Sequence, residues 1–267
     1  MVFVVQDAVD LRTKPDSDTY EQPLNERMRT FLRLEFLYRK TEHHLQRDSD
    51  LATRQAIDSI LEIGAILTRG DVRSEVLKEI ERQADQLQTF VNSPGVDTSR
   101  LSVLVDELAK QRNSVNALGP HYLQAMKDSE FLSAIKHRSA IPGGTCEFDL
   151  PLFSHWLRRS HESRSEDMER WLKDLRPLCV AVSQIMWLIR ESAIPKECMA
   201  DAGMYQHSLD KESNCRMLRV LIRDQAHLFP EISGSPQRFT IRFLQWGDID
   251  SRPIQTQDRV PFVLSFC

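Results

Sequence analysis

The sequence predicts an α+β protein in which an N-terminal antiparallel helical bundle domain is followed by a small antiparallel β-sheet domain. Apolar residues recur at helical spacing from Leu24 to Ile189, and the pattern changes to strict alternation after Pro195. The breaks between the helical segments are short, which is typical of antiparallel neighbours in a bundle. We therefore expect an acidic, flexible extension at residues 1–19, a helical domain at 20–194 and a β-strand domain at 195–267.

The helical segments are separated by recognisable start and stop signals. The first helix opens at the apolar repeat that includes Leu24 and Met28. Asp71 follows a glycine and can cap the next helix, and Asp97 can do the same after a break at Pro94-Gly95. Further helices are expected at Leu101 to Leu108, Phe131 to Ile135, Phe153 to Leu157, Glu166 to Leu175 and Leu178 to Ile189, with turns at Gly119-Pro120 and Ile141-Pro142-Gly143-Gly144.

The C-terminal segments have the period of β-strands. Residues Arg238 to Phe243 alternate strictly between polar and apolar side chains, which predicts a strand with one buried face. Further strands are expected at Gly203 to Gln206, Met217 to Ile222 and Val260 to Phe266, with Gly234, Pro236, Gly247 and Pro253 between them.

Composition and charge exclude several classes of protein. Lysine and arginine number 35 against 39 aspartates and glutamates, and the net charge of -4 argues against a general affinity for nucleic acid or anionic lipid. The five cysteines are widely spaced and form no CxxC pair, which argues against a zinc site and suits a reducing compartment. No apolar run approaches the ~20 residues of a membrane span. We expect a cytoplasmic protein without a signal peptide or membrane insertion.

The strand at 238–243 carries the first candidate binding site. Arg238 and Arg242 share the face opposite Phe239 and Phe243, and Thr240 lies on that face between the two arginines. Neighbouring residues on one face of a strand are two positions apart and lie ~7 Å from each other. Paired arginines suit an anion or an acidic peptide. An ordinary solvated face has the same pattern, so the strand alone leaves both interpretations open.

The first helix carries a second basic surface. Arg29 and Arg33 lie one turn apart, roughly opposite the apolar face, and Phe36 and Leu37 flank them. Arginine beside apolar groups suits a peptide that has both acidic and apolar residues. Alternatively, Phe36 and Leu37 pack on a neighbouring helix and the arginines only face water.

No catalytic constellation emerges from the sequence. His155 and Cys146 lie close enough along the chain to consider a Cys–His pair, but no orienting Asn or Asp accompanies them, and a lone His among apolar residues is more often packed in a core. The Pro142-Gly143-Gly144 turn lacks the P-loop pattern. HExxH, GxSxG and GxGxxG motifs are also missing from the sequence. We expect no enzyme activity, no metal and no cofactor.

Several segments taken together resemble the family of ZapD, the Z-ring-associated protein D of bacterial cell division. The segments occur in the family's order and at compatible spacings. They are Pro23 to Arg33, Arg69 to Arg73, Pro94 to Arg100, Ile141 to Pro151 and Ile232-Ser233-Gly234 with Arg238 to Phe243.

The resemblance implies a homodimer that binds the C-terminal tail of FtsZ, cross-links and bundles its filaments, and is recruited from the cytoplasm to the mid-cell division ring. It implies a basic pocket for the tail between the first helix and the sheet. The matching residues are Arg29, Arg33, His155, Arg238 and Arg242, and Arg69 matches a position linked with the dimer contact.

Three features depart from the family pattern. Residues 1–19 have no counterpart in it, the stretch from Arg39 to Gln55 does not match closely, and Glu130 stands where a basic residue is expected. A rival function is a single-stranded nucleic-acid binder that stacks bases on Phe239 and Phe243. The net charge and the expected burial of these two rings argue against that rival.

Overall fold

The computed structural model describes residues 18–90, 97–210, 214–223, 227–235 and 237–267. It has an α+β fold with helices followed by antiparallel sheets, as the sequence predicted. Two compact units divide the chain: residues 33–185 form a helical unit, and residues 18–32 together with 186–267 form a β unit, within the described ranges. The helices α1 (Glu26–Leu45) and α9 (Arg176–Glu191) each contribute residues to both units.

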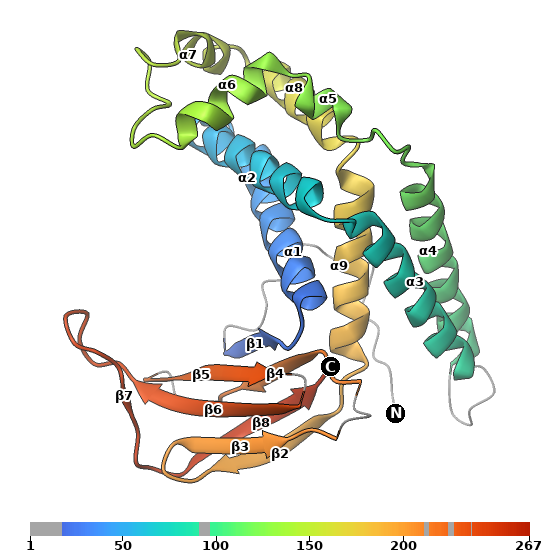
Figure 1. Cartoon of the computed structure of the whole chain (residues 1–267), viewed down its shortest axis with the longest axis vertical. Helices are drawn as coiled ribbons and strands as arrows, with labels where there is room; N and C mark the ends of the chain where they lie inside the picture. Colours follow the sequence, from blue (N-terminus) through green and yellow to red (C-terminus); the bar gives the residue numbers. More distant parts are fainter. Residues whose placement is uncertain (1–17, 91–96, 211–213, 224–226, 236) are drawn as a thin grey trace. The chain divides into compact units, whose positions relative to one another are not determined.

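The helical unit confirms most of the predicted elements (Figure 1). Asp71 caps its helix by accepting a hydrogen bond from the Ser74 amide, and Asp97 does the same from the Ser99 amide. The break predicted at Pro94-Gly95 lies outside the described residues. The remaining helices are α2 (Asp50–Arg69), α3 (Val72–Thr89), α4 (Thr98–Ala117), α5 (Gln124–Lys127), α6 (Glu130–Ser139), α7 (Pro151–Leu157) and α8 (His161–Leu172).

The break between α1 and α2 was not predicted, and a long-range contact accompanies it. Arg164 of α8 is buried, and it binds Asp48 at 2.9 Å and Asp50 at 2.6 Å where the chain turns between the two helices. Ser49 occupies the N-cap position but makes no side-chain cap bond. The turn therefore lacks the local cap that marks α3 and α4, and its acidic residues pair with an arginine more than a hundred positions away.

The β unit contains two antiparallel sheets where the sequence analysis placed one (Figure 1). Their orders are β1-β4-β8-β2 and β3-β6-β5, with β7 paired to β6. Leu218 and Leu264 from the first sheet and Phe239 and Phe243 from the second belong to one apolar core. The strands are β1 (Thr19–Pro23), β2 (Pro195–Ala200), β3 (Met204–Ser208), β4 (Met217–Leu221), β5 (Leu228–Ser235), β6 (Arg238–Gln245), β7 (Ile254–Gln255) and β8 (Val260–Phe266).

Strands β1, β2, β5 and β7 were missed, and Gly234 explains part of the error. The sequence analysis placed Gly234 between strands, whereas it lies within β5. A Cβ atom at this position would lie 2.9 Å from the Cβ of Phe239 and 3.0 Å from Cδ2 of Leu24. The glycine therefore permits a close approach inside the sheet, which is a known role for glycine in a strand interior.

A tight turn joins β2 to β3. Ala202 and Gly203 have φ values of 48° and 66°, and the amide of Met204 donates to the carbonyl of Asp201. Two consecutive positive φ values are the backbone conformation that two-residue hairpin turns favour. The strand β3 therefore begins at Met204, one residue after the predicted start. Within the described residues, none of the helices combines the length and apolar character needed to cross a membrane.

Candidate functional site

The arginine face of β6 is the solvent-exposed face of its sheet. Phe239, Ile241 and Phe243 are almost completely buried, while Arg238 and Arg242 are exposed. This confirms the predicted alternation, and it fixes the direction of each side chain because strand neighbours point to opposite faces. Because Phe239, Ile241 and Phe243 are buried, β6 is anchored in the core of the β unit. The two arginines therefore project from a rigid strand.

Arg238 lies among neutral polar groups. It is opposite Ser208 of β3 and Ser235 of β5, and its Nη2 donates to Oε1 of Gln206 over 3.4 Å. Thr240, the next residue on this face, shares the row. These groups offer hydrogen bonds but no compensating negative charge, so a carboxylate at Arg238 would form a charge-assisted contact.

Arg242 has a different environment from Arg238. It lies opposite Met204 of β3 and Glu231 of β5, and its guanidinium forms an ion pair with the Glu231 carboxylate. The two side chains are 51% and 50% exposed. Exposed ion pairs contribute at most about 1 kcal/mol, so a ligand carboxylate can displace Glu231 at modest cost. The sequence analysis missed Glu231 because only the pairing register of β5 and β6 brings it next to Arg242.

Arg29 belongs to the β unit, on the first turns of α1. Its Nε donates to Oε2 of Glu26 over 3.1 Å, and its side chain is 42% exposed. Leu24, Met28 and Phe31 are buried, which confirms the predicted apolar face of the helix. Arg29 therefore presents a partly neutralised charge at the helix surface.

Arg33 and Arg69 line the same pocket in the helical unit. Both line an open pocket of about 430 Å³ between α1 and α2, together with Phe36, Leu37, Glu62, Ala65 and Ile66. Phe36 is 59% exposed, so the alternative in which it packs on a neighbouring helix is wrong, whereas Leu37 is buried as that alternative required. A candidate tail-binding arginine and the candidate dimer-contact arginine thus share one surface.

His155 is exposed on α7, in contrast to the packed histidine that its apolar neighbours suggested. The neighbouring Trp156 is buried and donates to Oδ2 of Asp167 over 2.7 Å. Cys146 donates a weak hydrogen bond to Asp149, with 3.6 Å between sulfur and oxygen. Glu130 is exposed in the first turn of α6.

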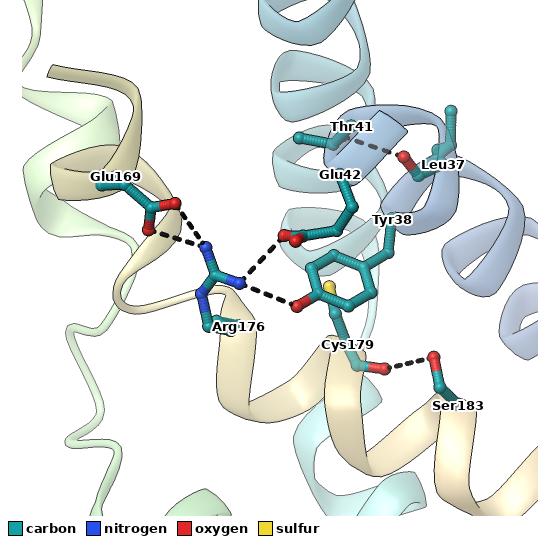
Figure 2. A network of polar contacts seen from close by, with 8 residues as sticks. All are labelled: Leu37, Tyr38, Thr41, Glu42, Glu169, Arg176, Cys179 and Ser183. Atoms are coloured by element: carbon teal, nitrogen blue, oxygen red, sulfur yellow. Dashed lines mark hydrogen bonds and ion pairs between the residues drawn. The ribbon is translucent and has the colours of Figure 1, made fainter. Parts of the chain in front are cut away.

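A polar network that the sequence analysis also missed joins α1, α8 and α9 in the helical unit. Figure 2 shows Arg176 between Glu169 on one side and Glu42 and Tyr38 on the other. The donor–acceptor distances from Arg176 are 2.6 and 2.8 Å to Glu169, and 2.9 Å to Glu42. Burial, followed by the charge of Glu42, raises the pKa of the Tyr38 hydroxyl well above its ordinary value, so this hydroxyl stays neutral. The network fixes the start of α9 against two other helices.

Comparison with known proteins identifies the family. The family model ZapD, described as a cell division protein, matches residues 32–242. The chain is 36% identical over 248 residues to the cell division protein ZapD of Methylococcus capsulatus, covering 93% of this chain and 97% of that protein. It is 37% identical over 251 residues to that of Dechloromonas aromatica and 36% identical over 248 residues to that of Escherichia coli O1:K1, with 93% of this chain and 98% of each relative covered. This chain therefore belongs to the ZapD family of cell division proteins.

Proposed function

We propose that the chain binds the C-terminal tail of FtsZ and cross-links FtsZ filaments into bundles, stabilising the division ring at mid-cell. The observation that carries this proposal is the row of Arg238, Thr240 and Arg242, in which both arginines are exposed, on a strand whose other face is buried. Membership of a cell division family supports the cellular role. A peptide with acidic and apolar residues is the ligand that such a surface favours.

The other basic candidates extend the same proposal. Arg29 supplies a charge on α1, Arg33 combines a charge with the exposed ring of Phe36, and His155 is an exposed polar group on α7. Each of these three side chains reaches solvent, as a contact with a peptide requires. We assign all three, with Arg238 and Arg242, to binding of the tail.

Cross-linking requires at least two tail sites in one particle. We propose a homodimer with Arg69 at or near the contact, because a two-fold dimer repeats each site on its second half. Tails recur along a filament, so weak individual contacts add through effective concentration. The protein acts in this scheme as a binding protein of the cytoplasm, without catalysis, cofactor, nucleic acid or membrane insertion.

The rival nucleic-acid function loses its main support in the structure. Sheets that bind RNA stack bases on aromatic rings of their open face. Phe239 and Phe243 are 1% and 0% exposed and belong to the core of the β unit. They are therefore not available for stacking. The open face of β6 carries Arg238, Thr240 and Arg242 instead.

Co-sedimentation tests the proposal directly. Polymerised FtsZ from the same source is pelleted with this protein, using full-length FtsZ and FtsZ that lacks its C-terminal tail. We expect the protein in the pellet only with the full-length form, and thickened bundles in electron micrographs of that sample. Equal amounts in the supernatant with both forms would overturn the proposal.

A further inference from the structure

The segment between α6 and α7 is a loop without helix or strand. Residues 141–150 form a series of turns, and α7 begins directly after them at Pro151. Gly143 has a φ of 72°, and a Cβ atom at Gly144 would lie 2.4 Å from the carbonyl oxygen of Arg138. The two glycines therefore permit a backbone path that a residue with a larger side chain could not follow without strain.

Arg54 of α2 holds both this loop and the helix that follows it. Its Nη1 donates to the carbonyl oxygen of Thr145 over 2.9 Å, across 91 positions of the sequence. The same guanidinium lies over the ring of Phe153 on α7, with 4.6 Å between Cζ and the ring centroid. Phe153 is 3% exposed and Arg54 is half-buried, so this cation–π contact is partly shielded from water and is stronger than one at an open surface.

The way in which α7 is held determines the direction of His155. The helix has only seven residues, and its N-cap residue Leu150 makes no side-chain cap bond, so α7 depends on packing for its stability. Phe153 and Trp156 are buried, and Trp156 is fixed by its hydrogen bond with Asp167. Residues one or two positions apart point to different sides of a helix. Anchoring the two buried rings therefore turns His155 toward solvent, where it is exposed.

We propose that Arg54 is a positioning residue for tail binding, which sets the direction of His155 by holding the 141–150 loop and Phe153 against α2. This inference rests on the proposed function, in which His155 contacts the tail. Arg54 does not need to touch the peptide, because its guanidinium already has partners in Thr145 and Phe153. Loss of Arg54 should therefore reduce the affinity for the tail only through His155.

A double-mutant cycle tests this dependence. Fluorescence anisotropy with a labelled peptide of the FtsZ C-terminal tail gives the affinities of the wild type, Arg54→Ala, His155→Ala and the double variant. We expect Arg54→Ala to weaken binding about threefold and His155→Ala about fivefold. The double variant should bind no more weakly than His155→Ala alone, because two residues that act through one contact are not additive.

Two further variants on α2 separate the role of the guanidinium from a general effect on the helix. Arg54→Lys should recover part of the affinity, since lysine keeps the charge but lacks the planar group that lies over Phe153. It also keeps the test available if Arg54→Ala does not fold, which circular dichroism would reveal. Gln55→Ala is the matched control, because Gln55 is the next residue of α2 and is exposed, so its loss should leave the affinity unchanged.

NMR of the histidine rings gives a readout that does not require the peptide. The chain has eight histidines, and the His155→Ala spectrum identifies the resonances of His155 by their absence. We expect Arg54→Ala to shift these resonances and Gln55→Ala to leave them in place.

Failure of this inference is distinguishable from failure of the proposed function. If the wild type does not bind the tail peptide, the proposed function is refuted. If the wild type binds, the positioning role is refuted by wild-type affinity in Arg54→Ala or in His155→Ala, or by losses that multiply in the double variant. Unchanged His155 resonances in a folded Arg54→Ala variant would also overturn it.

Discussion

Arg176 donates a hydrogen bond of 3.1 Å to the hydroxyl oxygen of Tyr38, and the same guanidinium binds Glu42 and Glu169 (Figure 2). Tyr38 is 1% exposed, so its hydroxyl has been removed from water and depends on this partner. A buried polar group that loses its partner costs about 1–3 kcal/mol. Arg176 therefore links α9 to α1 and α8 by donating hydrogen bonds to acceptors on both of these helices.

Replacement of Arg176 should destabilise the helical unit. We expect Arg176→Ala to lower the free energy of unfolding by about 2 kcal/mol, because it leaves Tyr38 and Glu42 without their shared donor. Arg259→Ala is a suitable control, since Arg259 is 72% exposed in its ion pair with Asp201 and such pairs contribute little. Urea denaturation followed by near-ultraviolet circular dichroism compares the two. Equal midpoints for both variants would contradict the role of the network.

Acid should weaken the helical unit through Asp167, which accepts the hydrogen bond from the buried Trp156. Burial alone would raise the pKa of Asp167, but hydrogen bonds from Trp156 and Arg170 and the charge of Arg159 outweigh it, so the folded-state pKa lies below the ordinary value of 3.8. A depressed pKa stabilises the folded state above the unfolded-state value, and this stabilisation is lost as the pH falls through the folded-state value.

The Asp167→Asn variant isolates that contribution. We expect it to be less stable than the wild type at pH 7, with the difference shrinking below about pH 4 as the wild-type carboxylate takes up its proton. Urea denaturation at a series of pH values measures the difference. A constant gap between the two proteins from pH 7 to pH 3 would show that the charge of Asp167 is not responsible.

Removal of both arginines of β6 should abolish tail binding without unfolding the chain. Arg238→Ala with Arg242→Ala removes two exposed side chains, while the buried face of β6 stays intact. Arg252→Ala with Arg259→Ala removes the same charge from exposed positions outside this row and should retain binding. Anisotropy with the tail peptide gives the affinities, and circular dichroism verifies the folds. Wild-type affinity in the first double variant would refute the site.

Removal of Glu231 should strengthen tail binding. Glu231 forms an ion pair with Arg242 in the free protein, so a ligand carboxylate must first displace the Glu231 carboxylate. We expect Glu231→Gln to raise the affinity about two- to fivefold at low salt, which matches the modest free energy of an exposed ion pair. The gain should shrink as salt screens the charges. An unchanged or weaker affinity would mean that the ligand does not contact Arg242.

The elements that the sequence predicted are those with local signals. Strand β6 alternates within its own residues, and Asp71 and Asp97 cap helices that begin immediately after them. By contrast, β1 is a strand only because it pairs with β4, nearly two hundred residues later, and no pattern within Thr19–Pro23 reveals that partner. Propensity over short windows cannot detect such a pairing.

The same distinction applies to the candidate site. The alternation of β6 was sufficient to place Arg238 and Arg242 on one exposed face. The ion pair with Glu231 depends on the register between two strands, and the pocket of Arg33 and Arg69 depends on how α2 folds back on α1. Neither relationship leaves a pattern in a single segment.

The order of strands in the first sheet has a consequence for the protein during its synthesis. Strand β8, the last element of the chain, lies between β4 and β2, and β4 in turn carries β1 from the beginning of the described chain. The helical unit can begin to pack while the ribosome is still translating, because domains generally fold as units in the order in which they emerge. The sheet has to wait for the residues of β8. A nascent chain stopped before Val260 would lack the strand that joins the two halves of that sheet, and would expose the edges of β4 and β2 together.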